Sequence, residues 1–164
     1  MAFDAFLYIK GIEGESTDGA HTGWIEVLSY SHGLSQPATA RSAAGSAAGE
    51  RCNHQDFSVV KVLDKTSPKL ALWCCNGKHI PEVKLELCRA TGAKQKYMEY
   101  RMEDVIVSGV RPGGSAHGGE TLPLEEVSFN YGKITWAYTE TDHETGASKG
   151  DVRANWDLKT NKGE

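Results

Sequence analysis

Histidine and cysteine are the residue types in this sequence with the greatest capacity to bind a metal ion. The chain contains six histidines and four cysteines. Cys52 and His54 would share one face of a strand, whereas Cys75, His79 and Cys88 are close in sequence. No pair has the C-x-x-C or H-x-x-x-H spacing that places two ligands on one ion. We therefore expect surface histidines, buried reduced thiols, and neither a metal site nor a cofactor.

Acidic residues give no stronger indication of catalysis. Glu99 and Glu103 are expected to alternate with apolar residues on a strand and to face solvent. The glycine-rich stretch "RPGGSAHGGE" lacks the GK[ST] of a phosphate-binding loop and the strand-to-helix setting of a dinucleotide-binding motif. We therefore expect no enzyme, and a hydrolase with dispersed acidic residues remains an alternative.

The overall charge and the N-terminus limit the possible partners. The 164-residue chain has a formal net charge of −4, which disfavours a dedicated nucleic-acid-binding protein. No apolar run is long enough to span a membrane. The N-terminal "MAFDAFLYIKG" lacks the basic region and cleavage site of a signal peptide. We expect synthesis in the cytoplasm and, if the protein is exported, a route that does not use a signal peptide.

The elements that would position these residues are mostly strands, within one domain that covers residues 1–164. A helix is predicted in "DKTSPKLALWCCNGKH", with Ser67 as its N-cap, Pro68 at its first position and Gly77 at its end. The apolar face of this helix should combine Leu70, Trp73 and Cys74, widened by Leu72 and Cys75. The small-residue segment 37–50 is predicted to be a long loop, and residues 140–164 a polar C-terminal tail.

The strand "WIEVLSYSHGLSQ", residues 24–36, changes its apolar face halfway. Apolar residues first fall on odd positions and then on even ones, so the odd face becomes small, polar and uncharged. The positions concerned are Ile25 and Val27, then Leu28, Tyr30 and Leu34, with Ser29, Ser31, Gly33 and Ser35 left on the odd face. Similar changes occur in 57–62, 100–107 and 127–138, the last around Gly132, a natural site for a β-bulge. They predict strands that bend at barrel corners, or strand ends that contact another copy of the chain.

Four segments of the sequence together resemble the Hcp (haemolysin-coregulated protein) family, the tube subunits of the type VI secretion system. They are "DAFLYIKGIEGESTDGAHTGWIEVLSYSHG", "QDFSVVKVLDKTSPKLALWCCNGKHIPEVKLEL", "DVIVSGVRPGG" and "GDVRANWDLKTNK". The resemblance implies a compact β-barrel of two antiparallel sheets with one flanking helix, similar to phage tail tubes. It further implies hexameric rings that stack into a hollow tube, a contractile sheath, a trimeric spike protein at the tip, and small effectors carried in the lumen of some members. Export of the family does not require a signal peptide.

The resemblance also suggests which residues face the lumen and which connect the rings. Ser29, Ser31, Gly33 and Ser35 would line the lumen, because they are small and polar but uncharged. The segment 37–50 would be the loop on which rings stack, with Thr39, Arg41, Ser42, Ala43, Gly45, Ser46 and Gly49 as its contact residues. At position 32 the chain has His where relatives often have an aromatic residue. The alternative from another class is a monomeric barrel that binds an oligosaccharide or single-stranded nucleic acid.

Overall fold

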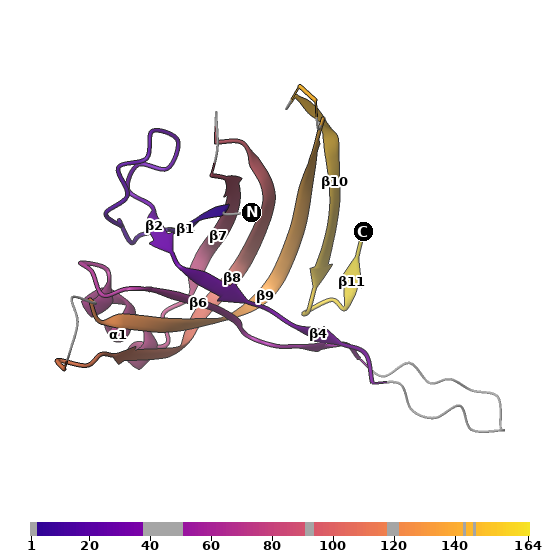
Figure 1. Cartoon of the computed structure of the whole chain (residues 1–164). Helices are drawn as coiled ribbons and strands as arrows, with labels where there is room; N and C mark the ends of the chain where they lie inside the picture. Colours follow the sequence, from indigo (N-terminus) through magenta and orange to yellow (C-terminus); the bar gives the residue numbers. More distant parts are fainter. Residues whose placement is uncertain (1–2, 38–50, 91–93, 118–121, 143, 146) are drawn as a thin grey trace.

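The computed structural model describes residues 3–37, 51–90, 94–117, 122–142, 144–145 and 147–164. These residues form eleven strands and one helix (Figure 1). The elements are β1 (Phe3–Ile9), β2 (Ile25–Val27), β3 (Ser29–Ser31), β4 (Leu34–Ser35), β5 (Asn53–His54), β6 (Phe57–Val62), α1 (Ser67–Asn76), β7 (Ile80–Arg89), β8 (Lys96–Gly113), β9 (Leu124–Thr141), β10 (Ser148–Asp157) and β11 (Lys162–Gly163).

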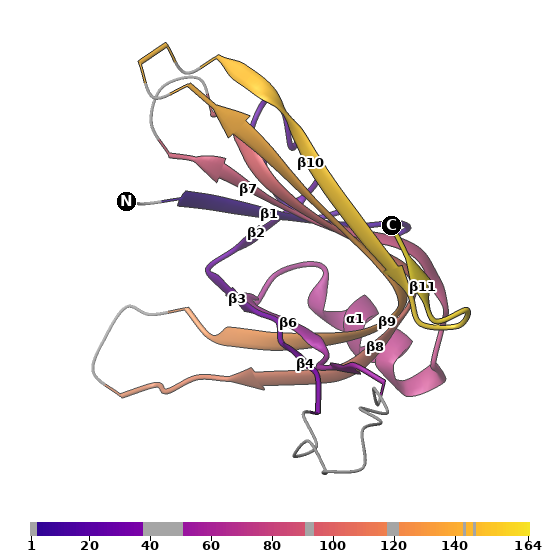
Figure 2. The ribbon, with the colours of Figure 1, turned by 90° about the vertical axis from the view of Figure 1, so that its right-hand side faces the viewer.

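Nine of the strands form one antiparallel sheet, and β4 and β5 form a separate two-stranded sheet. The order of the large sheet is β11-β10-β9-β8-β7-β1-β2, and β6 pairs with both β9 and β3. The first half of β9 pairs with β6 and its second half pairs with β10. Because β8 and β9 each have 18 residues, they run through both halves of the sheet. Figure 2 shows these two strands turning from one layer of the fold into the other.

The mainly β fold with one helix is confirmed, but the described strands do not close into a barrel. On one side of the sheet β2 pairs with β1, whereas the next strand, β3, pairs with β6. The chain changes partner at Leu28, whose backbone N–H donates a hydrogen bond to the carbonyl of Val60 at 2.8 Å. A closed barrel needs an uninterrupted ladder of paired strands. The sheet is instead folded over on itself, with its core between the two layers.

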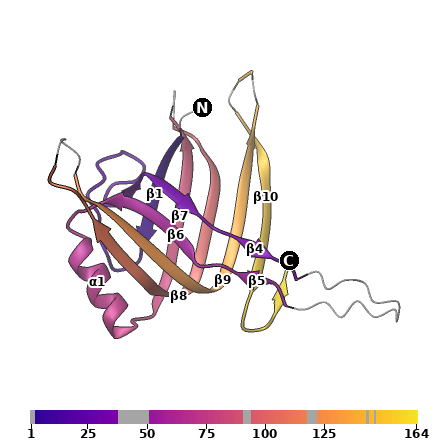
Figure 3. The same cartoon turned by 60° about the horizontal axis from the view of Figure 1, so that its bottom comes forward.

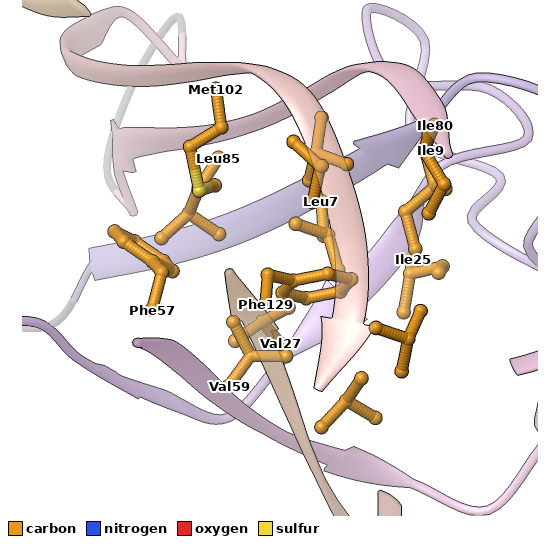
Figure 4. Packing of buried hydrophobic residues seen from close by; sticks show 14 of the residues in the cluster. Leu7, Ile9, Ile25, Val27, Phe57, Val59, Ile80, Leu85, Met102 and Phe129 are labelled. Atoms are coloured by element: carbon orange, nitrogen blue, oxygen red, sulfur yellow. The ribbon is translucent and has the colours of Figure 1, made fainter. Parts of the chain in front are cut away.

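The core consists of apolar side chains from the inner faces of both layers. Figure 4 shows how they interdigitate. Leu7, Ile9, Ile25, Val27, Leu85 and Met102 lie on one side, and Phe57, Val59 and Phe129 on the other. Each large apolar side chain in such a core contributes about 1.5–3 kcal/mol relative to an exposed position. The two layers are therefore held together mainly by the burial of these residues.

The predicted change of face in β8 and β9 has its origin at Asp104 and Gly132. Met102 and Val105 of β8 are both buried, so the inward face changes from even to odd positions. Asp104 has a left-handed backbone conformation, with φ of 52°. It lies opposite Gly132, where a Cβ atom would approach the Asp104 carboxylate to 3.1 Å. The predicted bulge at Gly132 is wrong, because the register of β8 and β9 shifts at a different place, between Val107 and Gly109.

Two other details of the predicted pattern differ from the structure. Residues 24–36 form three short strands rather than one, and the change of face there coincides with the change of partner at Leu28. Ile25 and Val27 are buried and Tyr30 packs against the core, but Leu28 and Leu34 are exposed. In β6 the expected change does not occur. Its odd positions all point inward, and the third of them is Lys61.

Helix α1 lies against the sheet as expected (Figure 3), with its start displaced by one residue. Its N-cap is Thr66, and Pro68 lies within its first two positions. Gly77 closes the helix with φ of 65°, and its N–H donates to the carbonyl of Trp73. Leu70 and Trp73 are buried and Cys74 packs against the core. Leu72 and Cys75 are exposed, so the buried face of the helix is narrower than predicted.

A buried ion pair connects β6 and β9 to the start of α1. Lys61 is fully buried, and its ammonium lies 2.7 Å from Glu125 Oε2 and 2.9 Å from Asp64 Oδ1. The Ser67 hydroxyl donates to the same Glu125 oxygen at 2.7 Å. Burial is the largest single influence on the pKa of Asp64 and would raise it. Hydrogen bonds from the hydroxyl and N–H of Thr66 and from Lys61 together outweigh burial, so the pKa is lowered. This network explains how a lysine can occupy an inward position of a core strand.

We predict that Lys61→Met will destabilise the fold by about 3–5 kcal/mol, because it leaves the Glu125 carboxylate buried without its counter-ion. Denaturant unfolding will measure this loss. The double variant Lys61→Met/Glu125→Leu should recover most of it, since neither charge then remains. A single variant within about 1 kcal/mol of the wild type would contradict the prediction.

Candidate functional site

Three of the four residues predicted to face the lumen are exposed. Ser29 and Ser31 on β3 and Ser35 on β4 are open to solvent, whereas Gly33 is half-buried. A Cβ atom at Gly33 would lie 2.4 Å from the side-chain oxygen of Gln55. The end of the Gln55 side chain thus packs directly against Gly33, and a larger residue there would displace it.

A row of small residues extends from Ser31 across three neighbouring strands. Ser31 lies opposite Ser58 on β6, which lies opposite Ser128 on β9, which lies opposite Gly109 on β8. Directly opposed residues in an antiparallel sheet project from the same face. The hydroxyls of Ser58 and Ser128 are 3.0 Å apart and share a hydrogen bond. We name these four residues the serine row. Sequence reasoning found only Ser31, because strand pairing could not be deduced from the sequence.

The opposite face of the same segment is aromatic. The ring of Tyr30 stacks on Phe57 with a centroid distance of 5.9 Å, and the ring of His32 lies 5.2 Å from Phe57. Both ring nitrogens of His32 are buried without a hydrogen-bond partner. Burial lowers the pKa of His32 and the neighbouring His54 lowers it further, and together they outweigh the opposite effect of the Gln55 backbone. His32 thus fills the place of an aromatic residue without satisfying its polar atoms.

Two groups of exposed apolar side chains lie on opposite sides of the molecule. The first, here called the leucine patch, comprises Leu28, Leu63, Leu122 and Leu124; Leu28 is 57% exposed and Leu122 67%. Three of its members line a hollow of about 390 Å³. The second, here called the β10 patch, consists of Val152, which is 68% exposed, and Tyr138 directly opposite it on β9. Figure 1 shows β10 on one side of the fold and the adjoining ends of β6 and β9 on the other.

The β10 patch lies beside an open strand edge. Within the described residues, β10 pairs with β9 along its length but with β11 only at Trp156 and Asp157. The outer edge of its first seven residues, 148–154, is therefore available for pairing. Natural proteins usually cover or protect such edges, and an uncovered edge is a ready site for addition of another strand.

The predicted stacking contacts lie outside the described residues. This applies to Thr39, Arg41, Ser42, Ala43, Gly45, Ser46 and Gly49. The described residues at both ends of the segment form the two-stranded sheet, in which Leu34 lies opposite His54 and Ser35 opposite Asn53. Next to this sheet is a hollow of about 370 Å³ that Arg51, Trp136 and Trp156 help to line. The long segment thus starts from a paired base beside β9 and β10.

The structure brings together three possible metal ligands, but not in the combinations considered from the sequence. His21, Glu86 and Cys88 have their ligand atoms within 4.8 Å of one another. Asp18 accepts or shares a hydrogen bond with the other nitrogen of His21 at 2.7 Å. His79 instead contacts Asp104 at 2.9 Å. Because His21 is 65 residues from Glu86, no local spacing could reveal this cluster.

One serine has the spacing of a catalytic motif without its structural setting. Residues 146–150, "GASKG", match G-x-S-x-G. A nucleophile elbow places its serine on a sharp turn between a strand and a helix. Ser148 is exposed at the first position of β10 and no helix follows it, so the match gives no support for a hydrolase.

Comparison with known proteins agrees with this geometry. The family model described as "Type VI secretion system effector, Hcp" matches residues 6–138. The chain belongs to the Hcp family. The protein named hcp1 of Pseudomonas aeruginosa is 36% identical over 162 residues, which cover 98% of each chain. A second protein of that organism, named the major exported protein, is 29% identical. The match covers 84% of this chain and 90% of that protein.

The fold of the Hcp family is also found by comparison of structures. A solved structure described as that of a type six secretion system protein superposes with a TM-score of 0.92 and 32% identity. The match covers 99% of this chain and all of the other. Among the residues that the structure describes, no helix combines the length and apolar character needed to cross a membrane.

We predict that His32→Phe will stabilise the fold at pH 7 by about 1 kcal/mol, because it removes two buried polar atoms that have no partners. The difference should grow as the pH falls. The unfolded chain binds a proton at His32 below about pH 6.5, whereas the folded chain, with its lowered pKa, does so only at lower pH. The free energy of unfolding of the wild type therefore decreases as the pH falls from about 6.5 to the lower pKa of His32 in the folded chain.

Thermal or urea unfolding at several pH values will measure the difference between the two proteins. The exposed residue His117 provides the control, since His117→Phe should leave the pH dependence unchanged. Parallel pH profiles for the wild type and His32→Phe would show that His32 does not contribute.

Proposed function

We propose that this chain is the structural subunit of a type VI secretion tube, in which six copies form a ring and the rings stack into a hollow tube. The observation that supports a ring is the position of the two apolar patches. They differ from each other and lie on opposite sides of the molecule. Contact between two different surfaces is heterologous, and it forms a closed ring when the rotation between neighbours closes.

The leucine patch and the β10 patch would form the contact between neighbours. The first has a hollow of about 390 Å³, and the second presents Val152 on β10 and Tyr138 on β9. The open edge of β10 would pair with the neighbour at the same time. Monomeric proteins rarely leave such large apolar residues grouped in the open, because their burial is favourable at about 25 cal/mol per Å².

The lumen would be lined by Ser29, Ser31 and Ser35 together with Ser58 and Ser128 of the serine row. Small hydroxyl side chains leave space and are readily hydrated. They carry no charge that would bind a passing protein tightly. Gly33 is half-buried beside the Gln55 side chain, so we leave it out of this surface in our proposal. The lumen would hold small effector proteins during export.

We propose the remaining partners and the route of export from the resemblance of this chain to the Hcp family. The segment 37–50 would contact the next ring, a trimeric spike protein would close the tip, and a contractile sheath would surround the tube. The protein would assemble in the cytoplasm and leave the cell without a signal peptide. It would act by assembly, with no catalysis, no nucleic acid and no membrane insertion.

Replacement of Val152 by Glu should prevent ring formation, because it places a charge in the apolar contact between neighbours. Native mass spectrometry will show monomers where the wild type shows six-membered rings. Leu72→Glu is the matched control: Leu72 is 58% exposed on α1, outside both patches, and this variant should still form rings. Intact rings of Val152→Glu would exclude the β10 patch from the contact, and a monomeric wild type would favour the ligand-binding alternative.

Replacement of Ser31 by Arg should reduce the retention of effector in the lumen while rings remain intact. A large cation at this position narrows the channel and changes the charge of a neutral wall. Pull-down of an effector from the same secretion system will measure retention, with ring formation checked by negative-stain microscopy. Ser115→Arg, at an exposed position outside the serine row, is the control. Equal retention by the two variants would remove Ser31 from the lumen.

A further inference from the structure

The outer face of β7 carries two metal-ligand types at alternate positions. Glu86 and Cys88 are two residues apart on the strand, so their side chains project from the same face. Cys88 is fully buried and the Glu86 side chain is 14% exposed. A carboxylate and a thiol in this arrangement can bind one metal ion together, and the rigid strand holds the two ligands in fixed positions.

The third ligand type comes from the connection between β1 and β2, which crosses this face. Backbone hydrogen bonds from Gly14 to Gly23 and from Ser16 to Trp24, at 2.7 and 2.9 Å, hold the connection together. The ring of His21 stacks on Phe6 at 4.2 Å and meets the edge of Trp24 at 4.8 Å. His21 is therefore buried and held in one orientation by packing.

Hydrogen bonding fixes which nitrogen of His21 points to the strand. Nδ1 lies 2.7 Å from Asp18 Oδ2, and Nε2 lies 2.6 Å from Glu86 Oε2 and 4.0 Å from Cys88 Sγ. A carboxylate on the far nitrogen is the usual support of a metal-binding histidine, because it orients the ring and makes it more basic. Asp18 occupies this position at Nδ1 of His21.

From this geometry we propose that His21 Nε2, Glu86 and Cys88 form a binding site for a thiophilic divalent cation of the zinc type. Metal–ligand distances of about 2.0–2.3 Å place tetrahedral ligand atoms about 3.3–3.7 Å apart. The observed separations of 2.6 and 4.0 Å lie on either side of this range. Each of these two separations changes by less than about 1 Å when the ion enters, and all three ligand atoms already lie within 4.8 Å of one another. A water molecule would complete the coordination.

The proton balance of binding follows from the present contacts. The ion replaces the proton that Nε2 and Glu86 share, and it also replaces the thiol proton of Cys88. Burial, and then the charge of Glu86, raises the pKa of the Cys88 thiol to about 11. Both protons pass to the solvent, so affinity increases with pH. The site does not depend on the proposed ring.

Neighbouring lysines leave the inner oxygens of both carboxylates free for the cluster. Lys94 lies 3.2 Å from Asp18 Oδ1, and Lys96 lies 3.6 Å from Glu86 Oε1. In each carboxylate the other oxygen, Oδ2 or Oε2, contacts His21. The same contacts would also hold a protonated histidine with no metal, and this is the arrangement that the experiment must distinguish from a metal site.

Titration of the purified, chelator-treated protein with Co²⁺, followed by displacement with Zn²⁺, tests the proposal. We expect one Co²⁺ per chain and a sulfur-to-cobalt charge-transfer band in the near ultraviolet, lost on addition of Zn²⁺. Cys88→Ser should lose the band. Asp18→Asn should weaken binding by about 10–100-fold, as loss of an outer-shell partner does. Cys75→Ser is the control, because Cys75 is exposed and outside the cluster.

Absence of the band in the wild type, or an unchanged band in Cys88→Ser, would overturn the proposal in favour of a proton-only cluster. Asp18→Asn keeps all three ligands, so it tests the site even if Cys88→Ser does not fold. Equal cobalt affinity of Asp18→Asn and the wild type would overturn the part of the proposal in which Asp18 supports His21 as a ligand.

Discussion

The bend shared by β8 and β9 is the constraint on which the rest of the structure depends. Asp104 has a left-handed conformation here, and Gly132 directly opposite leaves room for its side chain. The bend lets two 18-residue strands serve both layers. Before the bend Met102 points into the core, and after it Val105 does. A straight pair of strands would leave one of these two apolar runs in solvent.

The bend also determines which neighbours β9 can have. Its first half pairs with β6 and its second half with β10, on the same edge of the strand. These two partners belong to different layers, so β6 leads to the leucine patch and β10 carries the second patch. The separation of the two surfaces that we assign to ring contact thus follows from the bend in β9, which gives its two halves different partners. It is not a property of either patch alone.

The sequence was sufficient for the class of fold, the helix and the change of face in β8 and β9, but the change expected in β6 does not occur. Periodicity detects a change of face because it records which positions are apolar, and at Asp104 this matched the buried residues, whereas after Val27 the apolar Leu28 and Leu34 are exposed. It could not detect Lys61, since an inward lysine breaks the pattern unless Glu125 is known to lie beside it. Nor could it join Ser58 and Ser128 to Ser31, because register across strands is a long-range property. His21 and Glu86 were missed for the same reason.

The contacts of His21 also bear on the surface used for assembly. They tie the connection between β1 and β2 to β7 shortly before β2 begins, and β2 is only three residues long. The chain then leaves β1 and joins β6 at Leu28, with Val27 turned into the core and Leu28 turned out. Leu28 thereby lies beside Leu63 and Leu122 at the same hollow. A buried histidine on one face thus helps to set an exposed leucine on another, because the short strand between them leaves little freedom for adjustment.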